Sequence, residues 1–321
     1  KPNMRHRSSA VHRHKRNSSQ RKFVLDYNSV CQTVILAIVA VLAPSSFDSA
    51  TAFGLLRPRM SREVLRMTTK NGKGGDVEST LLVSSSDKLG FTGTEGNSIR
   101  LILASQSPRR REILDMMGLT DRYTVNPSPL DEPALQRELA ARPHLSPEDY
   151  AKTLAEQKAQ ALGLEMVTSA STAEHENTLI LGSDTIVDLD GTILEKPVDE
   201  NDAHAMLTKL SGNWHKVHTG VAIYGLGVPA TATSDYQQPS LLTSFTATAR
   251  VKFANLTPDD IKSYVNTGEP MDKAGSYGIQ GVGGQLVEMI EGDYFCVMGL
   301  PMHRLSRELS RTITLLEAKS K

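Results

Sequence analysis

Cysteine is scarce in this sequence of 321 residues, which contains only Cys31 and Cys296. Two cysteines so far apart exclude a disulfide framework, and they lack the spacing of zinc ligands. Aromatic residues are also few, at 5% of the sequence, while the hydrophobic fraction of 39% is ordinary for a globular protein. The apolar run from Val34 to Ala43 is too short to span a bilayer and has the length of a signal-peptide core.

A net excess of either charge is absent as well, because Lys and Arg number 36 and so do Asp and Glu. This balance hides an asymmetry. Residues 1–97 hold 15 basic and 7 acidic residues, which leaves 21 basic and 29 acidic residues for the rest of the chain. A net-acidic body binds nucleic acid poorly, so we expect no nucleic-acid partner. Basic clusters in the body should instead be local and should bind small anions.

Residues 1–97 are predicted to be an N-terminal targeting presequence and flexible linker. Residues 1–22 carry eight Lys or Arg and no acid, the apolar run follows, and small residues lead to Ala52 and Phe53. This order resembles the bipartite plastid presequence of algae with secondary plastids. A secretory signal, or a disordered extension of a cytoplasmic protein, remains an alternative. Residues 70–97 are typical of a linker, and we expect no stable membrane insertion of the mature protein.

The stretch from Leu101 to Leu114, LILASQSPRRREIL, predicts a strand, a polar turn and a helix beginning at Pro108. Ser107 suits the N-cap, and proline suits the first helical position, where no N–H is needed. Free N–H groups and the helix dipole attract an anion at such a point, and three guanidinium groups follow from Arg109 onward. The pattern favours a phosphate site. The alternative is a capped helix with a solvated basic first turn.

A second stretch, TLILGSDTIVDLDGTILEKP, places an acid among apolar neighbours. We expect a buried strand over residues 179–181 that G-S-D-T interrupts, with Asp184 in a desolvated place. A carboxylate there is costly unless it is paired or binds a metal. Residues 186–194 predict a hairpin with Asp-Gly in its turn. The letters D-L-D-G-T also resemble the first motif of haloacid-dehalogenase-type phosphatases, which makes Asp188 an alternative nucleophile.

Other elements are predicted from periodicity and turn residues. We expect a helix from Ser146 to Leu162 that Gly163 ends, and a core strand over residues 295–298. His215 and His218 lie three positions apart on a predicted strand and therefore on opposite faces. We interpret them as solvated side chains and not as a metal-binding pair.

Four motifs, taken in order, resemble those of the Maf family of nucleotide pyrophosphatases: S-x-S-P-R-R, G-S-D-T, L-E-K-P and D-K-A-G-x-Y-G-I-Q-G. The resemblance covers residues 98–310. It implies an α/β fold similar to that of the inosine-triphosphate pyrophosphatases, with a mixed sheet, flanking helices and a central cleft between two lobes. We therefore expect a Maf-like nucleotide pyrophosphatase domain over residues 98–321.

The resemblance also assigns roles to single residues. Asp184 is the expected catalytic acid, and the metal Mg²⁺ or Mn²⁺ is expected at Glu132, Asp184 and Glu195. From the residues alone, the acids at 131 and 132 favour a helix N-terminal cap, and Lys158 is typical of a solvated helical lysine. The expected substrate-binding residues are Ser105, Arg109, Arg110, Lys158, Thr185, Lys196, Lys273 and Gln280.

The implied reaction is metal-dependent hydrolysis of a nucleoside triphosphate to monophosphate and pyrophosphate. Arg109, Thr185 and Gln280 resemble the subgroup that acts on dTTP and UTP, including modified pyrimidine nucleotides, so the implied role is cleansing of a nucleotide pool. A homodimer is expected from the family. Two alternatives remain. One is a phosphatase that uses Asp188, and the other is a non-catalytic nucleotide-binding regulator of cell division.

Overall fold

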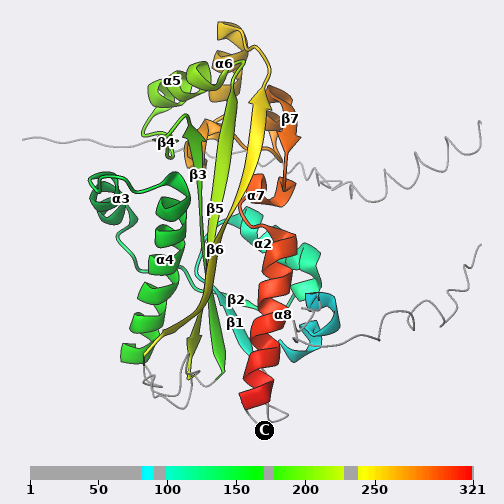
Figure 1. Cartoon of the computed structure of the whole chain (residues 1–321). Coiled ribbons are helices and arrows are strands. Elements are labelled where there is room, and N and C mark those ends of the chain that lie inside the picture. The colour runs from blue at the N-terminus through cyan, green and yellow to red at the C-terminus, as the bar shows by residue number, and fades with distance from the viewer. Residues whose placement is uncertain (1–80, 90–98, 170–176, 228–237, 320–321) are drawn as a thin grey trace, which may run out of the picture. The chain divides into compact units, whose positions relative to one another are not determined.

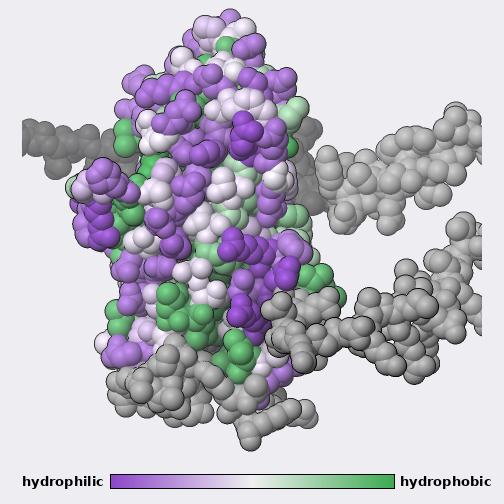
Figure 2. Space-filling view, in the orientation of Figure 1, coloured by the Kyte–Doolittle hydropathy of each residue, from purple (hydrophilic) through white to green (hydrophobic). Residues whose placement is uncertain are grey.

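The computed structural model describes residues 81–89, 99–169, 177–227 and 238–319. The predicted presequence lies outside the described residues, as does most of the predicted linker. Within the described ranges, no helix has both the length and the apolar character needed to cross a membrane. On the face seen in Figure 2, hydrophilic residues predominate and hydrophobic residues lie in small separate groups.

A mixed sheet of seven strands forms the centre of the fold. The strands are β1 (Arg100–Leu103), β2 (Thr124–Val125), β3 (Thr178–Leu189), β4 (Thr192–Leu194), β5 (Trp214–Leu226), β6 (Ser240–Phe253) and β7 (Val287–Glu291). Their order is β2-β1-β3-β5-β6-β7, and β4 pairs with β3. β1 is parallel to β2 and β3, and the other pairs are antiparallel. The long strands β3, β5 and β6 run side by side (Figure 1).

Helices cover both faces of this sheet. They are α2 (Pro108–Leu114), α3 (Glu132–Ala140), α4 (Pro147–Ser169), α5 (Glu200–Leu210), α6 (Pro258–Val265), α7 (Tyr294–Met298) and α8 (Met302–Lys319). Successive residues of a strand point to opposite faces. Accordingly, Ile180 of β3 belongs to the cluster that packs on α4, while Leu179 and Leu181 belong to the cluster that contains Ile113 of α2 and Leu305 of α8.

The other end of the long strands has a core of its own. Val187 of β3 and Phe253 of β6 are buried there together with Leu207 of α5 and Ile261 of α6. Thr257 begins α6 with a capping box, in which Thr257 and Asp260 each accept a hydrogen bond from the other's backbone N–H. The two groups of clusters make two lobes on one shared sheet, which confirms the predicted α/β fold.

Two glycines allow α4 to lie unusually close to the sheet. A Cβ atom at Gly182 of β3 would collide with the backbone carbonyl of Ala155, and one at Gly220 of β5 would collide with that of Ala151. Both carbonyls belong to α4, so neither can move without the helix. Only glycine avoids the clash at these two positions, and the close approach carries the following turn of α4, including Lys158, over β3.

Two sequence predictions about helix and strand ends are wrong here. Gly163 does not end α4, which continues to Ser169. The glycine instead makes room for a neighbour, since a Cβ atom there would lie 2.7 Å from the Cβ of Pro239. G-S-D-T also does not interrupt its strand. β3 is continuous because both of its edges are paired, with β1 and β5 over its first half and with β4 and β5 near its end.

The predicted strand over residues 295–298 is a short helix, α7. The side chain of Asp293 accepts a hydrogen bond from the backbone N–H of Phe295 and so caps its first turn. Gly299 ends it at a φ of 119°, a left-handed conformation that favours glycine. The apolar run is buried as expected, but its two capping residues select helix over strand.

Part of the predicted linker is packed against the body. Residues 81–89 form two 3₁₀ turns, Leu82–Ser84 and Ser86–Lys88. Leu82 and Leu89 are buried in the same cluster as α8, and the backbone N–H of Leu82 donates to Ser306 Oγ at 3.0 Å. These leucines give the short segment enough apolar surface to hold it on the helix.

We predict that Gly182→Ala lowers the free energy of unfolding by about 3 kcal/mol, because the new methyl group overpacks the contact with α4. Urea denaturation measures this loss. Gly268→Ala is the matched control, since its Cβ meets open space and only its φ of 72° is strained. That control should lose only about 1 kcal/mol. An equal loss in the two variants would contradict the close-approach argument.

Candidate active site

A cavity of about 480 Å³ lies between the two lobes, within the size range of small-molecule sites. It is lined both by the turn after β1 and by residues near Tyr277, which packs in the second lobe. Nine of the eleven predicted site residues line it. They are Ser105, Arg109, Arg110, Glu132, Lys158, Asp184, Thr185, Lys196 and Lys273.

A buried lysine between two carboxylates forms the centre of this cavity. Lys158 Nζ of α4 lies 2.5 Å from Asp184 Oδ1 of β3 and 2.8 Å from Glu132 Oε2 of α3. Its side chain is 9% exposed and that of Asp184 is 8% exposed. Burial alone would lower the pKa of Lys158, but the two carboxylates raise it above its ordinary value. Burial likewise opposes ionisation of Glu132, but Lys158, Lys196 and Arg110 together lower the pKa of that carboxyl.

Of the two adjacent acids, only Asp131 acts as the helix cap that the sequence suggested as an alternative. Asp131 caps α3 by accepting a hydrogen bond from the backbone N–H of Ala134 at 3.0 Å. Glu132 begins the same helix and turns its carboxylate to Lys158. Lys158, which on its own is typical of a solvated helical lysine, is therefore an ion-paired residue of the cavity.

A third carboxyl group, that of Glu195, lies beside this centre without lining the cavity. It follows β4, and Tyr150 of α4 is its hydrogen-bond partner. Burial, together with the negative charge of Asp184, raises the pKa of Glu195 to about 7. The carboxyl group is therefore balanced between its two protonation states near neutral pH, and a nearby cation would favour its charged form.

The three carboxyl groups fit a divalent metal by donor type. Carboxylate oxygens are the ligands that Mg²⁺ and Mn²⁺ prefer. Asp184 Oδ2 and Glu195 Oε1 are buried and have no hydrogen-bond partner among the described residues. In the described part of the chain, no three His, Cys, Asp or Glu side chains are already grouped as a metal would bind them. The amino group of Lys158 pairs with both Glu132 and Asp184 and so occupies the point at which these two carboxylates converge.

The turn after β1 positions a clamped arginine. Arg110 Nε donates to the carbonyl of Gly299 at 3.0 Å, Nη1 donates to Ser105 Oγ at 2.9 Å, and Nη2 donates to Thr185 Oγ1 at 3.3 Å. Ser105 Oγ also accepts from the backbone N–H of Ser107 at 3.2 Å. Burial lowers the pKa of Arg110, although guanidinium groups stay charged in proteins. The turn thus presents a fixed cation to the cavity.

Comparison with known proteins agrees with this geometry. The family model described as Maf-like protein matches residues 100–312. The chain belongs to the Maf-like family. It is 42% identical over 213 residues to the dTTP/UTP pyrophosphatase of Methylobacillus flagellatus, which covers 66% of this chain and 92% of that protein.

Two further relatives show how far the similarity extends. The dTTP/UTP pyrophosphatase of Bacillus velezensis is 42% identical over 210 residues, which cover 65% of this chain and 95% of the relative. A human protein described as a probable bifunctional dTTP/UTP pyrophosphatase/methyltransferase is 41% identical over 210 residues, which cover 65% of this chain and 31% of that protein. The similarity in all three corresponds in length to the Maf-like domain.

One acid of this Maf-like protein was missed by sequence reasoning. Asp272 lines the cavity and lies between two predicted phosphate-binding cations. Its carboxylate contacts Lys273 Nζ at 2.5 Å and Arg109 Nη1 at 3.4 Å. An exposed acid before a predicted lysine carries no signal in the sequence, because its second partner is 163 positions away. Triphosphate binding would have to compete with Asp272 for both cations.

Gln280 of this Maf-like protein lies just beyond the cavity lining, next to Ile279, which does line it. Its Nε2 donates to Glu112 Oε2 at 2.8 Å, and its Oε1 is buried without a hydrogen-bond partner among the described residues. Oε1 and the second N–H of Nε2 are thus an acceptor and a donor without a partner among the described residues, although Gln280 itself does not line the cavity.

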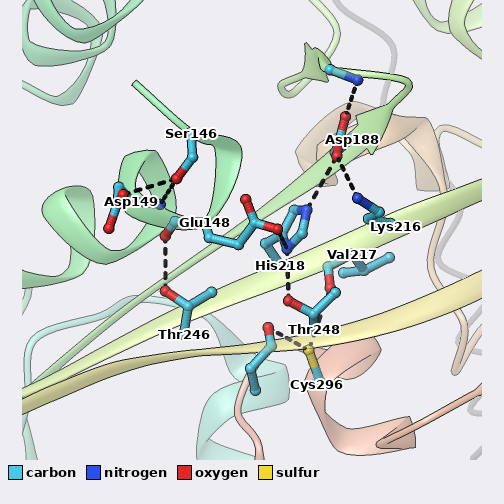
Figure 3. A network of polar contacts seen from close by, with 12 residues as sticks. Ser146, Glu148, Asp149, Asp188, Lys216, Val217, His218, Thr246, Thr248 and Cys296 are labelled. Atoms are coloured by element: carbon cyan, nitrogen blue, oxygen red, sulfur yellow. Dashed lines mark hydrogen bonds and ion pairs between the residues drawn. The ribbon is translucent and has the colours of Figure 1, made fainter. Parts of the chain in front are cut away.

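Asp188 belongs to a separate polar network, drawn in Figure 3. It is 4% exposed, does not line the cavity, and accepts from the backbone N–H of Gly191 at 2.6 Å in the hairpin turn. Its other oxygen lies 3.3 Å from His218 Nε2. A carboxylate engaged at both oxygens and shielded from solvent is poorly placed to attack a phosphate.

The two histidines of β5 lie on opposite faces, as predicted, but they are not solvated. His218 is fully buried, and its Nδ1 lies 2.8 Å from Thr248 Oγ1 (Figure 3). His215 is 3% exposed, and its Nε2 lies 2.8 Å from the hydroxyl of Tyr277. The prediction failed because strand periodicity assigns a face but does not show that helices cover both faces.

Burial of His215 predicts an acid-sensitive fold. Burial lowers the pKa of His215 from 6.5 to about 4, so the unfolded chain takes up a proton between these values while the folded chain does not. The contribution of neutral, buried His215 to the free energy of unfolding is therefore complete above pH 6.5 and is lost as the pH falls towards 4. It amounts to about 3 kcal/mol. We expect His215→Gln to remove this part of the pH dependence in urea denaturation.

The exposed His204 supplies the control for this prediction. His204→Gln should keep the wild-type dependence of stability on pH. Parallel stability curves for wild type and His215→Gln between pH 7 and pH 4.5 would contradict the assignment.

Proposed function

We propose that this protein hydrolyses nucleoside triphosphates, with dTTP and UTP favoured, to the nucleoside monophosphate and pyrophosphate. The observation that carries the proposal is the cavity itself. It places the buried carboxylate of Asp184 among five cationic side chains, and a triphosphate needs such neutralisation when charge moves onto the departing pyrophosphate. Those side chains are Arg109, Arg110, Lys158, Lys196 and Lys273.

Asp184 is the residue proposed to act on the attacking water. Its Oδ1 is held by Lys158 at 2.5 Å, which fixes the carboxylate in one orientation. Its Oδ2 is free of protein hydrogen bonds among the described residues, so it is the atom that orients the water and takes its proton.

The turn after β1 is proposed to hold the phosphates. Ser105 Oγ and the backbone N–H groups that follow it lie at the start of α2, where anions are favoured. Arg110 is fixed there by its three hydrogen bonds, whereas Lys196 is exposed at the rim. The fixed cation determines where the phosphates lie, and the exposed one adds charge with less geometric constraint.

A divalent metal, Mg²⁺ or Mn²⁺, is proposed to bind at Glu132, Asp184 and Glu195. When bound, it would supply positive charge that polarises the phosphate oxygens. The chain's own contribution is the unpartnered Oε1 of Glu195, and the Tyr150 hydroxyl that orients this carboxyl group.

The proposed natural role is removal of unwanted pyrimidine nucleotides, modified ones included, from a nucleotide pool. The support is the resemblance of Arg109, Thr185 and Gln280 to the dTTP/UTP subgroup, together with relatives that bear that name. Assembly as a homodimer is proposed from the family resemblance, and location in a plastid is proposed from residues 1–97.

The first test of function is product analysis. With dTTP or UTP and Mg²⁺, the protein should release pyrophosphate and monophosphate in equal amounts. Asp184→Asn should lower kcat by about 10³-fold, because an amide cannot take the proton of the water. Separate assays for pyrophosphate and phosphate measure both results.

Asp188→Asn is the control and should retain pyrophosphate release when activity is expressed per folded protein. Release of phosphate that depends on Asp188 would instead favour the phosphatase alternative. Absence of turnover with every triphosphate, combined with tight nucleotide binding, would favour the regulator of cell division.

The second test concerns base preference. Gln280→Ala should raise KM for dTTP and UTP by about tenfold, the value of one or two neutral hydrogen bonds, while kcat changes little. The exposed Gln285 offers a matched control, and Gln285→Ala should leave both constants unchanged. Equal effects of Gln280→Ala on dTTP and on GTP would contradict a role in reading the base.

A further inference from the structure

We propose that Thr219 of β5 is a positioning residue, which holds Arg110 in place by fixing the direction of the hydrogen bond at Thr185. Thr219 is fully buried and does not line the cavity, so it cannot touch a substrate there. It lies directly opposite Thr185 in the pairing of β3 with β5. The inference rests on the proposed function, because it explains how one of the phosphate-binding cations is oriented.

The proton positions follow from counting donors. Thr219 Oγ1 lies 2.8 Å from the backbone carbonyl of Cys296 and 2.9 Å from Thr185 Oγ1. A hydroxyl has one proton, and a carbonyl oxygen can only accept. Thr219 must therefore give its proton to Cys296, and it can only accept the proton of Thr185.

This direction leaves Thr185 as a pure acceptor towards the cavity. Its proton is directed away to Thr219, so the lone pairs of Oγ1 face Arg110 Nη2 at 3.3 Å. A threonine without this constraint could turn its hydroxyl and offer its own proton to the cavity. Thr219 removes that choice, and the hydroxyl of Thr185 becomes a fixed hydrogen-bond acceptor for the guanidinium group.

Arg110 is connected to α7 in two ways. Its Nε donates directly to the carbonyl of Gly299, and the series of hydrogen bonds from Arg110 through Thr185 and Thr219, here called the relay, ends on the carbonyl of Cys296. Cys296 lies in α7 and Gly299 is its C-cap, so this short helix anchors the arginine twice. The three bonds of Arg110 use one N–H on each nitrogen. One N–H remains on each of Nη1 and Nη2, which suits a pair of phosphate oxygens.

The test compares two substitutions at one position. Thr219→Val keeps the shape but removes the hydroxyl, and Thr219→Ser keeps the hydroxyl but removes a methyl group. We expect Thr219→Val to lower kcat/KM for dTTP by about 10- to 100-fold, while Thr219→Ser stays within about threefold of wild type. Binding of pyrophosphate, measured by calorimetry, should weaken in Thr219→Val only.

A double-mutant cycle separates positioning from mere stability. In an Arg110→Lys background there is no guanidinium group for the relay to orient. Thr219→Val should then cause little further loss of kcat/KM. Additive losses in the double variant, or equal activity of the Val and Ser variants, would overturn the proposal. If Thr219→Val fails to fold, Thr219→Cys can replace it, because the thiol is only a weak acceptor for the proton of Thr185. The same loss of kcat/KM is expected as for Thr219→Val.

The failure of this inference and that of the proposed function are distinguishable. If wild type releases no pyrophosphate from any triphosphate, the proposed function fails. If wild type is active and the Thr219 variants do not differ as stated, only the positioning role is overturned.

Discussion

The charge of Lys158 is buried between two carboxylates, and much of the site depends on that arrangement. Removing Lys158 would leave two carboxylates facing each other in a place from which water is largely excluded, and this is costly. The arrangement needs α4 to lie against the sheet, which Gly182 and Gly220 permit. The sheet positions Asp184, the glycines bring the helix close, and the helix delivers the lysine. Stability and chemistry are therefore linked at this point.

Successive side chains of β3 point to opposite faces of the sheet, and this joins the two halves of the site. Asp184 meets Lys158 beneath α4, and its neighbour Thr185 meets Arg110 and Thr219 on the other side. One strand thus presents the acid on one side and an acceptor for the guanidinium group of Arg110 on the other. A shift of one residue in the pairing of β3 with β5 would exchange the two and destroy both contacts. The unbroken strand, which the sequence did not predict, keeps this register fixed.

The sequence predicts the features that depend on neighbours along the chain. The start of α2 at Pro108 and the hairpin turn at Asp190 are examples. It fails where distant segments decide the outcome. Gly163 is interpreted as a helix end because the packing of Pro239 is invisible locally, and Asp272 is missed because Arg109 is remote in sequence. The set of site residues was found through motif resemblance, whereas their contacts required the fold.

The most direct test of the account is the fate of solvent oxygen when dTTP is hydrolysed in water enriched in ¹⁸O. Because pyrophosphate is the proposed leaving group, water oriented by Asp184 must attack the α-phosphorus. The account predicts that mass spectrometry finds one ¹⁸O atom in each molecule of dTMP and none in pyrophosphate. Label in pyrophosphate or in orthophosphate would place the attack on another phosphorus and contradict the central claim.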